Sequence, residues 1–247
     1  MDELRAHGRP AGAPRLKRAL DVILSAAGLV AAFPVIVAIA VAILLVDGRP
    51  VFYRHLRPGL HGEPFELIKF RTMRGAFDDR GRPIPQEERP TRLGYWLRKT
   101  SLDEIPELWT ILKGRMSLVG PRPLLMEYLA LYTPEQARRH EVKPGLTGLA
   151  QVMGRHNISW EQRFAYDLYY VDHWSMRLDA RIMLMTLRAM TQGDGRRPAN
   201  YFTGSALNAD PAARDEHEAA DPGATPADPD LARPAPDDER PWSARSR

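Results

Sequence analysis

Residues 98–106 read Arg-Lys-Thr-Ser-Leu-Asp-Glu-Ile-Pro, and residues 113–123 continue with Lys-Gly-Arg-Met-Ser-Leu-Val-Gly-Pro-Arg-Pro. Two adjacent carboxylates, Asp103 and Glu104, therefore stand between an Arg-Lys pair and a Gly-Pro-Arg-Pro turn. Carboxylates among permanent cations suit chemistry on a phosphate, because a carboxylate can attack phosphorus or hold a metal and arginine forks match phosphate oxygens. This stretch predicts the site around which the rest of the chain is organised.

The same stretch also has a purely structural interpretation. Ser101 and Glu104 have the spacing of a helix capping box, in which the glutamate only returns a hydrogen bond to the cap residue. Asp103 would then favour the positive end of the helix dipole, and Pro106 suits a helix start, where its missing N–H matters least. Spacing alone favours capping over catalysis, so the rest of the chain decides between them.

The composition of the chain points to an anionic partner. The 247 residues are enough for one core with appendages, and the absence of cysteine excludes disulfides and thiolate chemistry. Residues 205–247 carry ten acidic and five basic side chains, so their net charge of −5 leaves +9 on the remainder of a chain whose total is +4. A basic body predicts a phosphorylated substrate, nucleic acid or anionic lipid as partner.

Residues 22–46 form an uncharged apolar run between Asp21 and Asp47, long enough to cross a hydrocarbon core of roughly 30 Å. Phe33-Pro34 falls in the middle of this run, where proline removes a backbone hydrogen bond and bends a helix. Cations flank both ends of the run, whereas a simple crossing concentrates them on one side. A re-entrant helix that bends at Pro34 explains both flanks, and a single span with a tolerated proline remains an equal alternative.

A β-hairpin is predicted next. Residues 51–54 and 66–71 have the pattern of short strands, and residues 58–62 between them supply turn chemistry. Lys69 and Arg71 alternate with apolar residues, which places both cations on one strand face.

Aromatic side chains are dense in a helix predicted to begin at Ser159. They are Trp160, Phe164, Tyr166, Tyr169, Tyr170 and Trp174. This density suits a membrane–water interface, or equally an aromatic core. The other predictions are a loop over residues 75–92, helices over 108–112, 124–131, 134–141 and 177–190, and a short strand or turn over 151–155. Beyond residue 204 the chain is polar and proline-rich, which predicts a disordered tail.

Taken in chain order, the motifs resemble the bacterial sugar transferases, the small monotopic phosphoglycosyl transferases. The resemblance covers residues 15–191 and rests on the order and spacing of many motifs, since each alone is weak. After the basic and apolar N-terminal segment they are Lys69-Phe70-Arg71-Thr72-Met73, Ser101-Leu102-Asp103-Glu104, Lys113-Gly114, Met116-Ser117, Gly120-Pro121-Arg122-Pro123, Pro144-Gly145-Leu146-Thr147-Gly148, Gln151, Gly154-Arg155 and Tyr169-Tyr170-Val171.

The resemblance implies an activity and a set of site residues. A sugar-1-phosphate would pass from a UDP-sugar to undecaprenyl (polyprenol) phosphate with release of UMP, as the first membrane step in the synthesis of a glycoconjugate such as exopolysaccharide, O-antigen or a glycoprotein glycan. Asp103 is implied as the nucleophile of a covalent aspartyl intermediate, and Glu104 as a second catalytic residue that binds Mg²⁺. The implied substrate-binding residues are Lys69, Arg98, Arg122 and Arg155.

The implied fold is α/β, with a compact cytoplasmic catalytic domain on an N-terminal re-entrant membrane helix and in-plane amphipathic helices. We accordingly divide the chain into a flexible N-terminus (1–14), a membrane helix (15–48), a catalytic domain (49–202) and a disordered tail (203–247). The implied location is the cytoplasmic face of a bacterial inner membrane, with membrane lipids as partners, a homodimer as an option and no nucleic acid. Phe33 stands where family members often have serine, which leaves Pro34 as the main cause of the bend.

Two other functions fit parts of the sequence. A non-catalytic, membrane-anchored basic module that binds lipid or nucleic acid explains the +9 body and the apolar run, but leaves Asp103 and Glu104 without a role. A membrane-bound phosphatase predicts free phosphate or sugar phosphate as product and needs no lipid acceptor. Release of UMP from a UDP-sugar distinguishes the transferase from both.

Overall fold

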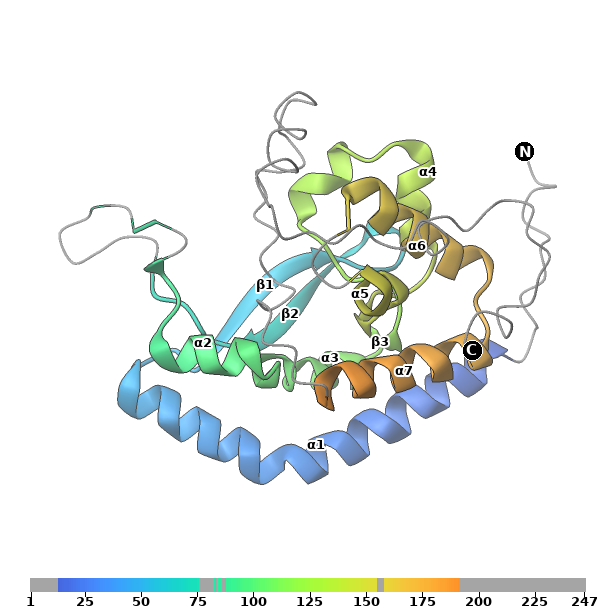
Figure 1. Ribbon diagram of the computed structural model, residues 1–247. Helices are drawn as coiled ribbons and strands as arrows, with labels where there is room; N and C mark the ends of the chain where they lie inside the picture. The colour runs from blue at the N-terminus through green and yellow to red at the C-terminus, as the bar shows by residue number, and fades with distance from the viewer. Residues whose placement is uncertain (1–12, 76–81, 83, 86–87, 155–157, 192–247) are drawn as a thin grey trace.

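The computed structural model describes residues 13–75, 82, 84–85, 88–154 and 158–191. Its longest element is α1 (Ala13–Val46), a helix of 34 residues with Pro34 inside it. Figure 1 shows that α1 is bent and runs along one side of the molecule, with the other elements on its concave side. The predicted tail lies outside the described residues, as does most of the predicted N-terminal segment.

The rest of the described chain mixes short strands and helices, as the α/β prediction required. β1 (Phe52–Pro58) and β2 (Pro64–Phe70) pair antiparallel along their whole lengths, so the hairpin is confirmed. β3 (Ser117–Val119) and β4 (Gly145–Thr147) form a separate parallel pair. The helices are α2 (Arg92–Lys99), α3 (Glu107–Leu112), α4 (Pro134–Ala137), α5 (Leu149–Gly154), α6 (Trp160–Asp172) and α7 (Met176–Thr191), with 3-10 turns η2 (Leu60–Gly62), η4 (Leu102–Glu104), η5 (Met126–Ala130) and η6 (Arg138–Glu141).

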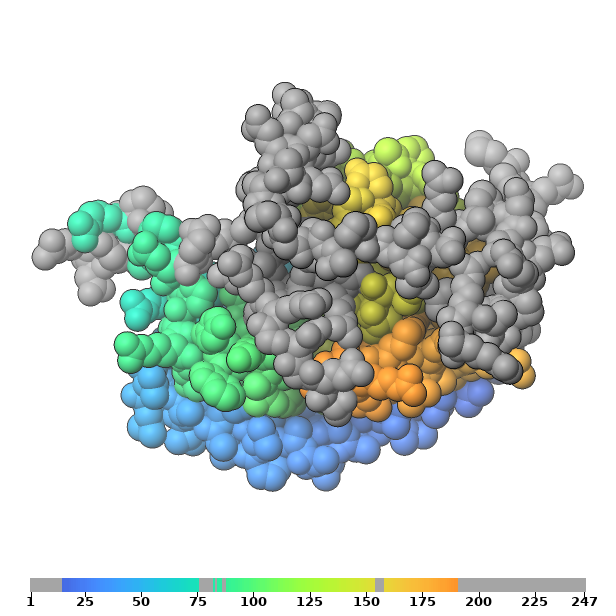
Figure 2. All heavy atoms as spheres, viewed as in Figure 1, coloured from blue at the N-terminus to red at the C-terminus, as the bar shows by residue number. Residues whose placement is uncertain are grey.

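Much of the apolar surface of α1 faces away from the domain. Val30, Phe33 and Leu45 are 77%, 64% and 81% exposed. Residues 15–46 contain a window of mean hydropathy 3.1 that is only 11% buried, so α1 is long and apolar enough to cross a membrane. Figure 2 shows α1 as a blue band along the lower edge of the molecule. An exposed apolar surface of this extent indicates contact with lipid or with another protein.

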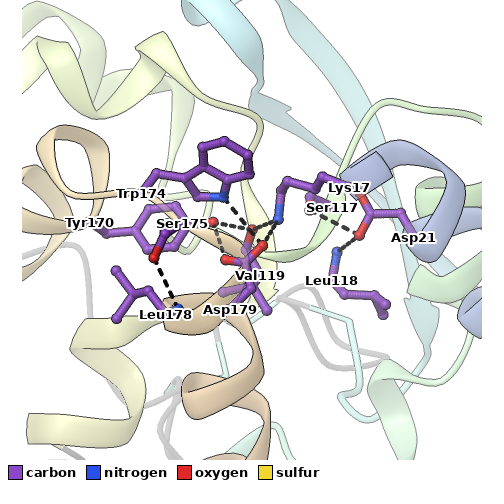
Figure 3. A network of polar contacts seen from close by, with 10 residues as sticks. All are labelled: Lys17, Asp21, Ser117, Leu118, Val119, Tyr170, Trp174, Ser175, Leu178 and Asp179. Atoms are coloured by element: carbon purple, nitrogen blue, oxygen red, sulfur yellow. Dashed lines mark hydrogen bonds and ion pairs between the residues drawn. The ribbon is translucent and has the colours of Figure 1, made fainter. Parts of the chain in front are cut away.

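The N-terminal end of α1 is tied to the domain through Asp179 of α7 (Figure 3). Lys17 Nζ lies 2.6 Å from Asp179 Oδ2 and also donates to the carbonyl of Val119 at 3.1 Å. The indole of Trp174 donates to Asp179 Oδ2 at 3.3 Å, and the Tyr170 hydroxyl donates to Oδ1 at 2.8 Å. Both oxygens of this buried carboxylate therefore have donors, and the network fixes α1 against α7 and β3.

A second carboxylate, on α1 itself, completes the attachment. Asp21 Oδ1 accepts hydrogen bonds from the Ser117 hydroxyl at 3.1 Å and from the Leu118 amide at 3.0 Å (Figure 3). Arg18 donates to the carbonyl of Ile111 at 2.7 Å and to that of Leu112 at 2.6 Å, where α3 ends. These bonds hold the polar start of α1 on β3 and α3.

The C-terminal end of α1 packs against the same domain. Ile43 is fully buried and belongs to a core cluster with Phe70 of β2 and Leu97 of α2. Arg71 donates to the carbonyl of Asp47, one residue beyond the helix, at 2.5 Å. Both ends of α1 thus contact one domain, and the helix runs along it instead of leaving it.

The chain just after β3 contacts the start of β4 backbone to backbone, at Gly120 and Gly145. A Cβ atom on Gly120 would lie 2.4 Å from the carbonyl oxygen of Lys143, and one on Gly145 would lie 2.1 Å from the Gly120 nitrogen. Only glycine permits such an approach. This contact fixes the position at which the turn that carries Arg122 begins.

Two local predictions were wrong. In place of the strand or turn predicted for residues 151–155, the described residues 151–154 are the end of α5, because Leu149 and Ala150 are buried and α5 packs on α6 and α7. The helix predicted for residues 124–131 is the 3-10 turn η5, which buries Tyr128.

The dense aromatic residues form core, not a membrane interface. Trp160, Phe164 and Tyr170 are 8%, 5% and 1% exposed. Trp160 stacks on Phe164 at a centroid distance of 5.8 Å and meets Tyr128 edge-on at 5.8 Å. Such pairs contribute packing beyond burial alone. Of the two alternatives, the aromatic core is therefore the correct one for these side chains.

Candidate functional site

Asp103 and Glu104 lie in η4, between α2 and α3. Ser101 just before them is left-handed, with φ 56° and ψ 16°, and its side chain makes no capping hydrogen bond. The capping-box alternative is therefore wrong, because the left-handed residue turns the chain before α3 can start there. The turn directs Asp103 into the domain, where it is only 3% exposed.

Glu104 is held by two cations from distant parts of the chain. Lys69 Nζ of β2 lies 2.7 Å from Glu104 Oε1, and Arg122 Nη2 lies 2.6 Å from the same oxygen. Burial raises the pKa of Glu104, but Arg122 and Lys69 outweigh it and hold the pKa well below its usual range. Three residues predicted from the sequence are thus brought together, with Glu104 ionised.

Asp103 is in a different electrostatic state from its neighbour. Its Oδ1 atom is buried without a hydrogen-bond partner among the described residues. Burial and the nearby Glu104 charge raise the pKa of Asp103 to about 6, against the pull of Lys69, Arg98 and Arg122. At neutral pH about nine-tenths of Asp103 is therefore ionised. A carboxylate oxygen that lacks donors is a suitable nucleophile.

Glu107, at the start of α3, belongs to the site but was missed. It is 2% exposed, and its Oε1 atom lies 3.0 Å from Lys69 Nζ. Burial raises the pKa of Glu107 to about 7, the Glu104 charge adds to this, and Lys69 only partly compensates. Glu104, which Arg122 contacts as well, is therefore held ionised more strongly than Glu107. The four-residue spacing from Asp103 could have indicated a third carboxylate in the site.

Arg57 on β1 is a second residue missed by sequence reasoning. Arg57 is paired with Phe65, and Tyr53 with Lys69, so Arg57 and Lys69 share one face of the hairpin. The Arg57 Nε atom is buried without a hydrogen-bond partner among the described residues. Burial, followed by the charge of Arg122, lowers the pKa of Arg57, while Glu107 partly compensates. Its strand position relative to Lys69 could have identified this further cation.

The remaining predicted residues divide into three groups. Arg98, in the last turn of α2, influences Asp103 electrostatically. Arg155 lies outside the described residues, so its predicted role in binding stays a prediction. Phe33 and Pro34 are exposed on α1, and Pro34 as the hinge of the bend also stays a prediction.

The carboxylates fit magnesium bound jointly with a substrate. Mg²⁺ usually takes one or two carboxylates together with phosphate oxygens and water. Within the described ranges, no group of three or more His, Cys, Asp or Glu residues forms a metal cage. Both cations on Glu104 contact Oε1, and Asp103 Oδ1 has no donor in the described part of the chain. Carboxylate oxygens are thus available to a Mg²⁺ ion whose remaining ligands would be phosphate oxygens and water.

Most of the chain is similar in sequence to a known protein family and to several individual proteins. The sequence model for the bacterial sugar transferase family matches residues 13–193. The uncharacterized sugar transferase EpsL of Bacillus subtilis is 50% identical over 189 residues, which are 76% of this chain and 93% of that protein. The exopolysaccharide production protein ExoY of Rhizobium meliloti is 36% identical over 204 residues, 76% of this chain and 90% of ExoY.

A longer relative matches through part of its length. The UDP-glucose:undecaprenyl-phosphate glucose-1-phosphate transferase of Xanthomonas campestris is 42% identical over 178 residues. These residues are 67% of this chain but only 37% of that protein. The family match covers α1, the hairpin and every described residue of the site. The chain therefore belongs to the bacterial sugar transferase family.

Proposed function

We propose that the protein transfers a sugar-1-phosphate from a UDP-sugar to undecaprenyl phosphate and releases UMP. Relatives named as UDP-glucose:undecaprenyl-phosphate glucose-1-phosphate transferase and undecaprenyl-phosphate galactose phosphotransferase support this function. The observation that carries it is Asp103, a buried carboxylate whose Oδ1 atom lacks a donor among the described residues and lies in a field of cations. A non-catalytic basic module would give no reason for such a carboxylate.

In the proposed mechanism, the Asp103 carboxylate attacks the phosphorus that carries the sugar. The new oxygen–phosphorus bond makes an acyl phosphate on Asp103, and the bond to UMP breaks, so UMP leaves with the electron pair. An oxygen of undecaprenyl phosphate then attacks the same phosphorus and expels the Asp103 carboxylate. The product is undecaprenyl-diphosphate-sugar and the side chain is regenerated. Covalent catalysis thus divides one displacement between two anions into two steps.

The cations around Asp103 have complementary parts in this mechanism. Arg122 and Lys69 keep Glu104 ionised, and together with Arg57 and Arg98 they supply positive charge for phosphate oxygens. Glu104 would hold Mg²⁺ jointly with the substrate phosphates, and the ion would neutralise charge that builds on the departing UMP.

We also propose that α1 is re-entrant, with both ends on the cytoplasmic face of the inner membrane. A straight helix of 34 residues is about 51 Å long and would carry one end away from a domain held at the other. Instead Lys17 at one end and Arg71 beside the other end bind within the same domain. The exposed apolar middle of α1 would then enter the bilayer while the site stays at its surface.

Exposed apolar side chains on other helices support contact with the membrane surface. Leu184, Leu187 and Met190 on α7 are 61%, 57% and 63% exposed, and Trp96 on α2 is 65% exposed. Figure 1 shows α2, α3 and α7 in a layer next to α1. Apolar residues on a helix with cationic neighbours are typical of interfacial helices.

The transferase is tested by UMP release. Protein in undecaprenyl phosphate-containing vesicles should release UMP from at least one of a panel of UDP-sugars, and chelation of Mg²⁺ should stop it. With no lipid acceptor, release should end at about one equivalent, and the intact mass should rise by one sugar phosphate. Intersecting double-reciprocal lines without a mass adduct would indicate direct transfer. Absence of UMP release across the panel would contradict the function.

The topology of α1 is tested by labelling. Because the chain has no cysteine of its own, Arg15→Cys and Arg54→Cys each give a single thiol. In oriented vesicles both should react from the same side with an impermeant reagent. Reaction from opposite sides would establish a crossing helix. Pro34→Ala should shift the protein toward opposite-side labelling, since it restores the missing hydrogen bond.

A further inference from the structure

A buried ion pair, Arg139 with Asp167, lies next to Arg122. Arg139 of η6 is 2% exposed and Asp167 of α6 is 2% exposed. Arg139 Nε and Nη2 both donate to Asp167 Oδ2, at 3.0 and 2.6 Å. Two hydrogen bonds from one guanidinium therefore join η6 to α6, between residues 28 positions apart in the sequence.

The same guanidinium also reaches the chain at Arg122. Arg139 Nη2 donates to the carbonyl oxygen of Arg122 at 2.8 Å, and the Arg122 side chain contacts Glu104 Oε1 at 2.6 Å. Hydrogen bonds therefore join Asp167 to Arg139 and Arg139 to the Arg122 backbone, and the covalent frame of Arg122 connects that backbone to the guanidinium that binds Glu104.

We propose that Arg139, held by Asp167, is a positioning residue that fixes the backbone of Arg122 and so directs the Arg122 guanidinium at Glu104 and the substrate phosphate. This inference rests on the proposed transferase function. Arg139 is not a catalytic residue in this account, since it acts through Arg122.

The composition of the turn explains why a side chain is needed here. Pro121 and Pro123 have no N–H, so the turn has few donors of its own and is held through its carbonyls. The carbonyl of Pro121 accepts from the Gly145 amide at 3.0 Å. The next carbonyl, of Arg122, accepts from Arg139. Two adjacent anchors therefore define the direction in which the Arg122 side chain leaves the turn.

The surroundings of Arg139 restrict it to this orientation. Its guanidinium carbon lies 5.9 Å from the ring centroids of both Tyr132 and Phe164. Stacking contacts of this kind favour arginine over lysine, as does the forked geometry that lets one group bind both a carboxylate and a carbonyl. A lysine could pair with Asp167 but would supply only a single point of attachment.

The test removes the pair and keeps the core. Breaking only one partner would leave a buried charge, whereas replacing both with apolar residues is often tolerated. Arg139→Met/Asp167→Leu also takes the Asp167 charge from the nearby buried Arg163, so folding of this variant is measured first. The folded variant should lose about tenfold or more in kcat/KM for UMP release, because a misplaced phosphate-binding group is costly.

A neighbouring ion pair supplies the matched control. Arg138 and Asp172 join the same two elements, η6 and α6, at the exposed surface. Arg138→Met/Asp172→Leu should leave kcat/KM within about twofold of the wild type, as expected for an exposed pair.

A second background separates positioning from a merely structural role. In an Arg122→Lys protein, adding Arg139→Met/Asp167→Leu should cost less than about twofold, because residues that act through one another are not additive. An equal loss in both backgrounds, or a folded double variant with wild-type kcat/KM, would overturn the inference.

If the double variant does not fold, Arg139→Lys decides: a tenfold loss in folded protein supports positioning, and wild-type kcat/KM refutes it. Absence of UMP release by the wild type would instead overturn the transferase function, and this inference with it.

Discussion

Two buried aspartates in this molecule differ in how many hydrogen-bond donors surround their carboxylates. Asp179 is 6% exposed and Asp103 is 3% exposed. Asp179 accepts bonds from Lys17, Tyr170 and Trp174, so both of its oxygens have donors. Asp103 has a raised pKa, because of its burial and then the Glu104 charge, and its Oδ1 atom has no donor within the described residues.

The difference distinguishes a carboxylate that holds α1 on the domain, Asp179, from one that is available for reaction, Asp103. A buried charge with a complete set of donors stabilises one arrangement, here the position of α1 on the domain. A buried charge with too few donors destabilises the folded state and is available for another atom to approach. Such groups are expected at functional sites, where stability is lost in exchange for activity.

Asp103→Asn should abolish turnover, because the amide has the shape of the carboxylate but is a poor nucleophile. We expect UMP release to fall by about a thousandfold or more, the scale seen when a nucleophile is removed. The measurement is single-turnover UMP release, together with the absence of a sugar-phosphate adduct in the intact mass. Activity within tenfold of the wild type would show that Asp103 is not the nucleophile.

Asp179→Asn should instead destabilise the protein, since the amide leaves Lys17 without its buried counter-charge. We expect a loss on the order of 3 kcal/mol in the free energy of unfolding. Denaturation in detergent measures this, and activity per folded molecule should be retained. Glu66→Gln is the control, because its pair with Arg54 is exposed and should contribute about 1 kcal/mol or less. Equal effects of the two substitutions would contradict the assigned role of Asp179.

Asp103→Asn should make the folded protein more stable at neutral pH. The pKa of Asp103 is about 6 in the folded protein against 3.8 ordinarily, so ionisation penalises the folded state as the pH rises from 4 to 6. Removing that penalty should raise the free energy of unfolding by up to about 3 kcal/mol at pH 7.5. The gain should vanish below about pH 4, where the carboxyl is protonated in both states. A gain that persists at acidic pH would indicate another cause.

Activity should fall as the pH drops through about 6, because protonated Asp103 cannot attack phosphorus. The ionised fraction decreases about tenfold between pH 7 and pH 5, and kcat/KM should follow it. Glu107→Gln distinguishes Asp103 from Glu107 as the source of the acidic limb, since this variant lacks the raised pKa of Glu107 but should keep the limb. A flat profile between pH 7 and pH 5 in the wild type would refute the assignment.

The sequence was sufficient where chemistry and periodicity act over short distances. The apolar run predicted α1, the alternation of Lys69 with apolar residues predicted β2, and the family motifs led to Glu104 and Arg122. The structure brings Lys69, Glu104 and Arg122 into contact. These successes depend on short-range patterns and on the order of many motifs along the chain.

The failures involve tertiary context. The spacing of Ser101 and Glu104 alone favoured a helix cap, and only the left-handed backbone at Ser101 excludes it. Strands of three residues, such as β3, have too little pattern to be recognised, and β3 is held by Asp21 from nearly a hundred residues earlier. Glu107 and Arg57 were missed because their burial, which makes them part of the site, is a property of the assembled domain.

The contact of Gly120 with Gly145 has a consequence for how this protein can vary. Most packed positions in a protein can change in sequence, because a smaller side chain at one position can be compensated by a larger one at its neighbour. Two backbones in direct contact have no side-chain atoms to exchange, since a Cβ on either glycine would overlap the other strand. A substitution elsewhere in the domain can be compensated by a change in a neighbouring side chain. At Gly120 or Gly145 the added side chain would overlap backbone atoms, which no second substitution removes. The Arg122 guanidinium, two residues after Gly120, is therefore attached to a part of the chain that tolerates little change.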